Sequence, residues 1–182
     1  MVSLTIGIAC GKGKEKDNIK VKSNVNKNED LNVDDNKTDN TLQQTLSAYG
    51  TATAVIDKDN VLYTWGGNDY DRLQNDRSRP LKMIDNAKSV SLGQCHSAVI
   101  TEKGELYMWG DNHYGQLGNG SKEDCEVPTK VMENVKCVSL GWMHSEVLTE
   151  NGELYGFGDG EYIGYGTHSS SLQPVLIMEN IK

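Results

Sequence analysis

Short runs of alternating apolar and polar residues follow one another from Thr45 to the end of the chain. In SAVITEKGELYMW, at 97–109, β-branched and aromatic residues lie on either side of Glu102-Lys103-Gly104, a composition that favours strands. A glycine in so short a connection supplies the positive φ of a hairpin turn. TENGEL, at 149–154, repeats the arrangement with Asn-Gly, the strongest short hairpin signal. The pattern predicts antiparallel hairpins and no helix.

The predicted hairpins belong to a repeat. The segment 89–110, SVSLGQCHSAVITEKGELYMWG, returns 48 residues later, at 137–158, as CVSLGWMHSEVLTENGELYGFG. A more divergent copy, TLSAYGTATAVIDKDNVLYTWG, occupies 45–66. The three units end alike, in KMIDNAK, KVMENVK and LIMENIK. They divide the domain into the repeats 45–88, 89–136 and 137–182.

Short strands that recur at this period, in a sequence rich in glycine and aromatic residues, are typical of propeller blades. Pro80, Pro128 and Pro174 each precede an apolar stretch. An edge strand or the start of a strand tolerates proline, because the missing N–H is not needed there. The predicted fold is therefore all-β, a partial β-propeller of about three antiparallel, four-stranded blades.

The repeat reads LYxWGxNxYGQLGNG and VxxGxxHSxxLTExGELY, and these motifs resemble the regulator of chromosome condensation repeat. The resemblance covers 45–182 and is strongest in the second unit. Its landmarks there include Gly93, His96, Trp109, Gly110, Gly115 and Gly118. The third unit keeps Gly141, His144 and Gly158, and the first keeps Trp65 and Gly66.

The outer repeats depart from this pattern. The third has Phe157 for the tryptophan and YIGYG for the GQLG run, and the first has Ala52 for the histidine. The resemblance implies that complete family members close seven-bladed propellers. Three repeats then indicate a fragment, a degenerate remnant or a subunit completed by assembly, and two chains would supply six blades.

The glycines of the repeat raise the alternative of a phosphate-binding loop. Such loops open a helix, and the common form ends in Lys-Ser or Lys-Thr. The sequence predicts no helix after 106–120 and has no such pair there. We therefore interpret the glycines as corners between strands.

The N-terminus, MVSLTIGIAC, resembles the end of a bacterial lipoprotein signal, in which the cysteine becomes the lipidated first residue of the mature chain. Here that residue would be Cys10. The match is partial, because Gly7 stands where the family has an aliphatic residue and no basic segment precedes the apolar run. Residues 1–10 are thus predicted to be signal-like, and the alternative is an ordinary disordered N-terminus.

The segment 11–44 is almost entirely polar, and its few aliphatic residues follow no period. It cannot bury enough apolar surface to offset the entropy of ordering, so we predict a disordered linker. No apolar stretch is long enough to span a bilayer. The resemblance at Cys10 implies a lipid-anchored protein of the bacterial cell envelope or exterior, and a cytoplasmic location is the alternative.

Charge bears on the choice of partner. The chain of 182 residues has a net charge of −8. Residues 1–45 hold seven charges of each sign, so the acidic excess lies entirely in the repeats. An acidic surface repels the phosphate backbone of nucleic acids. The sequence therefore predicts no nucleic-acid partner.

His96-Ser97 and His144-Ser145 suggest a base beside a nucleophile. Adjacent residues of a strand point to opposite faces, so neither pair forms a dyad by itself. Their recurrence at one position of the repeat favours a structural role, most simply a buried hydrogen bond that ties strands together. We predict no catalytic residue.

No metal site or cofactor is predicted either. The four cysteines lack C-x-x-C spacing, which argues against zinc. Cys95 aligns with Met143 and is expected in an apolar position, Cys125 is expected in a loop, and pairing of Cys125 with Cys137 has no specific support. GDGEYIGYG, at 158–166, departs from a calcium-binding loop.

Three classes of function remain. We expect a non-enzymatic scaffold for an unidentified protein partner, as is usual for repeat architectures. The resemblance implies two alternatives, guanine-nucleotide exchange with chromatin binding and the inhibition of an enzyme. We also expect self-association through the open ends of the arc. The side chains expected there are Phe157, Val175, Leu176 and Ile177 in the third unit and Val55, Ile56 and Leu62 in the first.

The lipid anchor is testable by fractionation. If Cys10 is lipidated, the chain made from its natural start should pellet with membranes, and Cys10→Ser should release it with the repeats still folded. Retention should be firm, because two or more acyl chains hold a protein far more tightly than one. Soluble wild type made from a verified start would contradict the anchor.

Overall fold

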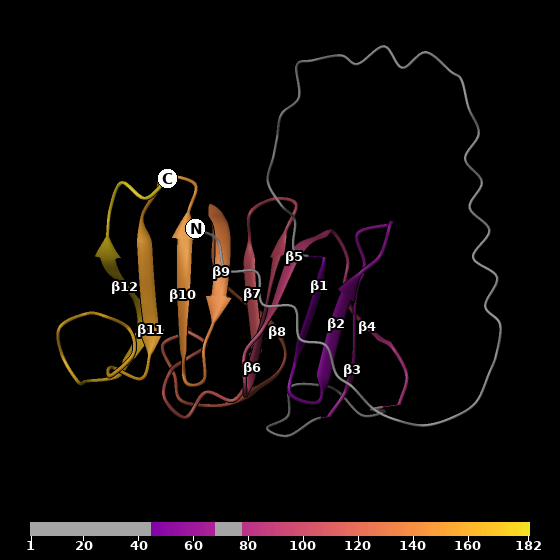
Figure 1. The fold of residues 1–182 in the computed structure, drawn as a ribbon, viewed down its shortest axis with the longest axis horizontal. Coiled ribbons are helices and arrows are strands. Elements are labelled where there is room, and N and C mark those ends of the chain that lie inside the picture. The colour runs from indigo at the N-terminus through magenta and orange to yellow at the C-terminus, as the bar shows by residue number, and fades with distance from the viewer. Residues whose placement is uncertain (1–44, 68–77) are drawn as a thin grey trace, which may run out of the picture. The chain divides into compact units, whose positions relative to one another are not determined.

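The computed structural model describes residues 45–67 and 78–182 (Figure 1). Twelve strands form three separate four-stranded sheets, each built from strands consecutive in the chain. No helix occurs among the described residues. The predicted all-β fold with three blade-like sheets is confirmed.

Each repeat supplies one blade. The first blade contains β1 (Leu46–Tyr49), β2 (Ala52–Ile56), β3 (Leu62–Gly66) and β4 (Leu81–Ile84). The second contains β5 (Ala87–Leu92), β6 (His96–Thr101), β7 (Leu106–Gly110) and β8 (Cys125–Met132). The third contains β9 (Val135–Leu140), β10 (His144–Thr149), β11 (Leu154–Gly158) and β12 (Ser171–Met178). All neighbours pair antiparallel, and Figure 1 shows the blades in succession, with the first and third at opposite ends.

The central hairpin of each blade turns where the sequence places glycine or asparagine. Gly104 has a φ of 73° and Gly152 a φ of 78°, a region that L side chains rarely adopt. In each case the glycine N–H donates to the carbonyl of a threonine three residues earlier, Thr101 or Thr149. Asn60 takes the same role in the first blade, with a φ of 59°.

The same turns hold the end of each repeat. The carbonyl of the turn residue accepts a hydrogen bond from the N–H of the last residue but one of the same repeat, which in the first two repeats also begins β5 or β9 of the following blade. These bonds are Ala87 to Asn60 at 2.8 Å, Val135 to Gly104 at 2.9 Å and Ile181 to Gly152 at 2.9 Å. The residue before each donor has a positive φ, namely Asn86, Asn134 and Asn180. The shared ending of the repeats is therefore a turn that needs asparagine, which tolerates this conformation better than most residues.

The hydrophobic core lies between the sheets. One cluster joins the first and second blades and includes Ala54, Leu62, Val90 and Trp109. A second cluster joins the second and third blades and includes Ala98, Ile100, Val147 and Phe157. Because side chains alternate between the two faces of a strand, the middle blade contributes opposite faces of its sheet to the two clusters.

Burial corrects part of the expectation about open ends. Phe157 was expected on the open end of the third blade, and it is instead fully buried against the second blade. Ile56 and Leu62 of the first blade are likewise buried against the second. The cause is the direction of each side chain, because alternate residues of one strand face opposite neighbours. Leu176 is exposed as expected.

Two further observations bear on the sequence-based expectations. Cys125 was expected in a loop, and it begins β8 instead. Cys95 is buried, as expected for an apolar position.

Cys10 and the linker 11–44 lie outside the described residues, so the lipid anchor stays a prediction. Within the described ranges, no helix is long and apolar enough to cross a membrane.

Two tryptophans of this chain form a matched pair for testing the core. Trp109 is 0% exposed within the first cluster, whereas Trp142 is 51% exposed in the connection between β9 and β10. Trp109→Ala should lower the free energy of unfolding by about 3–5 kcal/mol, because it leaves a large cavity. Trp142→Ala should change it by at most about 0.5 kcal/mol. Equal losses in denaturant melts would contradict this packing.

Candidate protein-interaction site

The contact between the second and third blades contains a buried hydrogen bond between side chains. Nε2 of His96 lies 2.8 Å from Oγ of Ser145, and that hydroxyl donates to the carbonyl of Gln116 at 2.7 Å. Since the serine proton goes to Gln116, Nε2 of His96 carries the proton of the other bond. The His-Ser motif thus links one blade to the next, and His96 does not act on its own neighbour, Ser97.

The contact between the first and second blades lacks this bond. Ala52 occupies the position of His96, as the register shows, because Ala52 is opposite Gly66 and His96 is opposite Gly110. The hydroxyl of Ser97, which corresponds to Ser145, is buried and has no hydrogen-bond partner. The histidine and serine therefore work as a pair across a blade junction.

The other landmark glycines serve these junctions and the strand ends. Gly66, Gly110 and Gly158 close β3, β7 and β11 with φ values of 105° to 109°. Gly93 and Gly141 each follow the first strand of their blade and donate to the carbonyls of His96 and His144. Trp65, the counterpart of Trp109, lies on the side of the first blade that faces away from the second, and it is partly exposed.

The connection between β7 and β8 packs on the third blade. A methyl group at Gly118 would lie 2.8 Å from the Phe157 ring, and one at Gly115 would lie 2.6 Å from Cδ2 of Leu172. These glycines thus allow a close approach between blades.

The corresponding connection of the third blade is shorter but similar. Ile163 is buried like Leu117, and Gly164 and Gly166 have φ values of 68° and 80°, matching Gly118 and Gly120 at 66° and 83°. The sequence comparison treated this run as lost, whereas its turn geometry is kept. The correspondence of these glycines is hard to see in the sequence, because the third repeat has two residues fewer in this segment than the second.

We define the trailing face of the third blade by His144, Glu146, Leu148, Leu154 and Gly156. Their counterparts in the second blade are His96, Ala98, Ile100, Leu106 and Met108, by the common register of the two hairpins. All five counterparts are completely buried beneath the third blade. Leu148, Leu154, Glu146 and His144 are only partly buried, because no described blade follows.

One cross-strand pair makes this face unlike the two internal ones. Ala54 lies opposite Thr64 and Ala98 opposite Met108, whereas the third blade places Glu146 opposite Gly156. A methyl group at Gly156 would lie 3.0 Å from Oε1 of Glu146. It would also lie 3.1 Å from Cβ and from the carbonyl oxygen of Ile163, so the glycine leaves room both for the glutamate and for the connection between β11 and β12.

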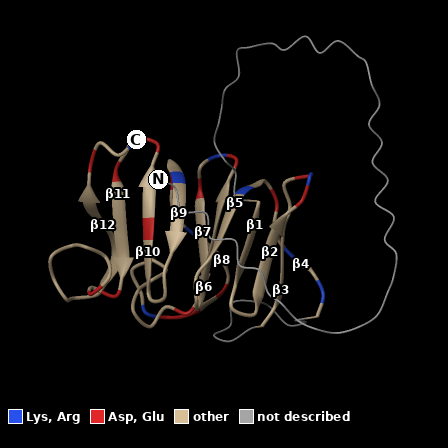
Figure 2. Ribbon diagram, viewed as in Figure 1, with Lys and Arg blue, Asp and Glu red and all other residues tan. Residues whose placement is uncertain are grey.

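Glu146 is the one charged residue of β10 and lies within the strand. Most other acidic residues of the described chain lie near strand ends and turns, as Figure 2 shows. Burial raises the pKa of its carboxyl group to about 7. Its Oε2 atom is buried and makes no hydrogen bond. A carboxylate held in this way is costly when charged and favours either protonation or a partner that donates hydrogen bonds.

His144 has also lost the partner that its counterpart has. Its Nδ1 atom is buried without a hydrogen bond, and burial lowers its pKa against the opposing influence of Asp159. The ring of Tyr162 lies against it, with centroids 5.6 Å apart. Trp142, Tyr162 and Tyr165 are exposed in the two connections at this end of the blade. Exposed aromatic residues beside unpaired polar groups are typical of protein-binding surfaces.

A second cluster, missed by the sequence analysis, consists of Asp111, His113 and Asp124, whose ligand atoms lie within 4.8 Å of one another. Such a set suits a divalent cation in principle. One oxygen of each carboxylate, however, already accepts hydrogen bonds from this connection. Oδ1 of Asp111 accepts hydrogen bonds from Gln116 and from both the backbone and the ring of His113, and Oδ1 of Asp124 accepts one from the Asn112 N–H at 2.7 Å. We infer that the three residues stabilise the connection between β7 and β8.

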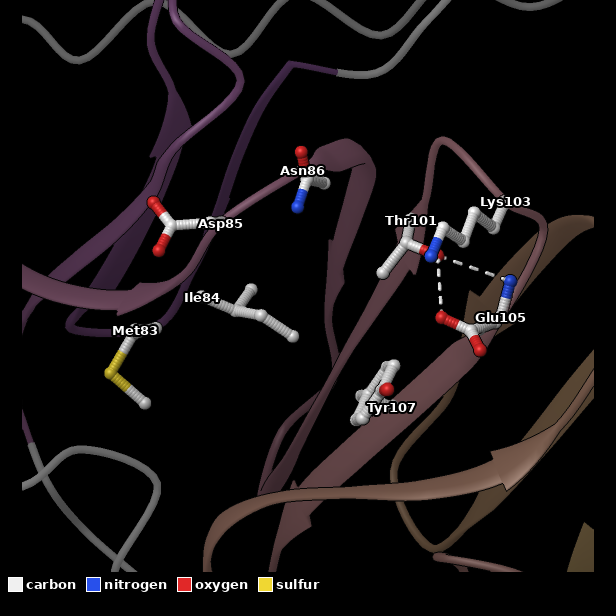
Figure 3. Close-up of a pocket in the computed structure, with 8 residues that line it drawn as sticks. All are labelled: Met83, Ile84, Asp85, Asn86, Thr101, Lys103, Glu105 and Tyr107. Carbon is white, nitrogen blue, oxygen red and sulfur yellow. Dashed lines mark hydrogen bonds between the residues drawn. The ribbon is translucent and has the colours of Figure 1, made fainter.

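A groove of about 400 Å³ separates the outer part of the first blade from the central hairpin of the second (Figure 3). Glu105 is its central carboxylate, and it accepts hydrogen bonds from Thr101 at 3.5 Å and from Lys130 at 2.7 Å. The lysine holds the pKa of Glu105 below its usual range. A paired, ionised carboxylate of this kind stabilises a hairpin and is not poised as an acid.

Comparison with known proteins agrees with this architecture. Residues 103–148 match a family model described as the regulator of chromosome condensation (RCC1) repeat, and residues 87–116 match a second model of the same description. The middle of the chain, residues 87–148, is thus similar to RCC1 repeats. The matched residues span the second blade and part of the third, including the junction of His96 with Ser145. No curated protein sequence matches the chain significantly.

Solved RCC1-type propellers share the fold. Prp20p from Saccharomyces cerevisiae aligns with a TM-score of 0.65 and 23% identity over 74% of this chain and 38% of that one. The structure of human WBSCR16 aligns with a TM-score of 0.64 and 26% identity over 73% of this chain and 38% of that one. The chain therefore spans less than two fifths of the length of these structures.

The junction bond can be tested with two serines of one repeat position. Ser145→Ala should lower the free energy of unfolding by about 1–3 kcal/mol, because it leaves His96 without its buried partner. Ser97→Ala should be neutral or slightly stabilising, since the hydroxyl it removes is buried and unpaired. Urea melts of the two variants give the free energies of unfolding, and Ser145→Ala should lose more than Ser97→Ala. An equal loss from Ser97→Ala would contradict the pairing across blades.

Proposed function

We propose that this chain is a non-enzymatic scaffold that binds a protein partner through the trailing face of its third blade. The observation that carries the proposal is the contrast between equivalent faces. The face containing His96 and Ala98 is completely covered by the following blade, whereas His144 and Glu146 on the equivalent face are only partly buried and Oε2 of Glu146 makes no hydrogen bond.

The chemistry of the described residues supports binding more than catalysis. His96 is bonded across a blade junction, and the acidic groups of the groove and of the 111–124 connection are held in hairpin and loop structure. Two similar structures also concern protein partners: Prp20p with its binding to Gsp1p and histones, and yeast RCC1 (Prp20) with Kap60. Those partners belong to those proteins, and the shared property that we carry over is binding to proteins.

Nucleotide exchange with chromatin binding and enzyme inhibition, the two alternatives implied by family resemblance, have no specific support among the described residues. The acidic charge of the repeats also disfavours direct contact with nucleic acid. Our proposal includes the cell envelope as the location, with Cys10 as the lipid anchor and residues 11–44 as the tether. Partners are then expected among envelope or exported proteins.

A capture experiment with matched variants tests the scaffold. Immobilised full-length chain should retain specific proteins from a cell-envelope extract. Glu146→Arg should abolish that retention, because it places a large charge in the middle of the trailing face. Val127→Arg provides the control, since Val127 is exposed on the outer strand of the second blade, away from that face. Equal retention by both variants would refute this face as the binding site.

A further inference from the structure

The opposite end of the arc also carries an uncovered face. We define the leading face of the first blade by Leu46, Thr53, Val55, Tyr63 and Trp65. Their counterparts in the third blade are Val138, Ser145, Val147, Tyr155 and Phe157, which lie against the second blade. Leu46 is 61% exposed, whereas its counterpart in the second blade, Val90, is 1% exposed. The difference arises because no described blade precedes the first.

We propose that the trailing face of the third blade binds the leading face of the first blade in a second copy of this chain. The contact would repeat the junction between the second and third blades. This inference rests on the proposed function and names the partner of the same face.

The polar pairing across the new junction is already present in the sequence. In the internal junction, the ring of His96 is bonded to the hydroxyl of Ser145. His144 is the counterpart of His96, and Thr53 is the counterpart of Ser145. Thr53 keeps the hydroxyl group, so a second copy offers His144 the bond that His96 makes. The pairing is directional, because the histidine lies on the trailing face of the third blade and the hydroxyl group lies on the leading face of the first.

The apolar contact has its counterparts as well. In the internal junction, Ala98 packs in one cluster with Val138 and Leu140 of β9. The equivalent residues of the leading face are Leu46 and Ala48 of β1. Covering Leu46, Val55 and Trp65 removes apolar surface from water, which favours association.

Glu146 makes this junction sensitive to pH. It replaces Ala98, so it faces the region of Leu46 in the second copy. Around it in its own chain lie Gly156 on β11, Ser139 on β9 and the ring of His144 two residues earlier, with Asp159 acting on that ring. The leading face as defined contains no carboxylate or amine. Docking therefore buries the Glu146 carboxyl group further and favours its protonated form.

The sign of the effect follows from the pKa of about 7. If docking raises this pKa by one more unit, association weakens about fivefold between pH 6 and pH 8. Glu146→Ala restores the residue of the two internal junctions. It should remove the pH dependence over this window and tighten association at pH 8. Burial lowers the pKa of His144, which disfavours the charged form of its ring.

Charge-swapped variants test the geometry directly by sedimentation of the full chain. Wild type should form dimers or larger assemblies at micromolar concentration. Leu46→Glu places a carboxylate opposite Glu146, and Glu146→Arg places a cation against an apolar face, so each variant alone should be monomeric. An equimolar mixture of L46E and E146R should associate, because each variant has one intact face and the altered faces carry opposite charges. Thr53→Val should weaken association several-fold, and V127R should behave like wild type.

Each outcome decides the proposal. Association of the mixture but not of the separate variants supports a head-to-tail junction and also shows that both variants are folded. A monomeric wild type at all concentrations and at both pH values would overturn the second copy as partner. Capture of a different protein by a monomeric chain, lost with E146R, would leave the scaffold intact and refute only this partner. Association that persists in L46E or E146R alone would place the contact elsewhere and overturn the proposal.

Discussion

The packing of one sheet face against the next is the contact on which the rest of this structure depends. A single four-stranded sheet of these repeats has two faces with apolar side chains, and alone it can cover neither. The middle blade is the only described blade with neighbours on both sides, and it contributes most of the buried hydrophobic residues of the described chain, from Val90 and Val99 on one face to Ala98 and Met108 on the other. The fold is therefore stabilised by the packing of consecutive blades, because each blade buries an apolar face of its neighbour.

This dependence explains which residues recur. The asparagine with a positive φ before the second and the third blade, the glycines that allow close approach and the histidine that reaches the next serine all act between units. The two outer blades show what happens when one of the recurring residues is replaced. Ala52 leaves the hydroxyl of Ser97 without a partner, and Glu146 puts a carboxyl group where its counterparts have alanine. The second replacement is accompanied by glycine at position 156, so the sheet accommodates the larger side chain on one face without disturbing Phe157 on the other.

Such a replacement changes what the face can recognise. An alanine face accepts any complementary apolar sheet, whereas a half-buried carboxyl group with a pKa of about 7 distinguishes partners by their hydrogen-bond donors and by pH. The site was visible in the sequence only as an unremarkable glutamate within the repeat. Its significance depends on comparison with Ala54 and Ala98 in register, and on the position of this blade at the end of the described arc.

The sequence by itself determined the class of fold, the number of repeats and the hairpin turns, because the alternation of side chains and the positive φ of Gly104 and Gly152 are local requirements. It also indicated that the paired histidine and serine are structural. The tertiary structure alone decided which serine each histidine meets, and it moved Phe157, Ile56 and Leu62 from the expected open ends into the core. The alternation of residues in a sequence shows which side chains share a face of a strand. It does not show which neighbouring sheet covers that face. Only the order of the blades in space assigns one face to the core and leaves the other uncovered by the described blades.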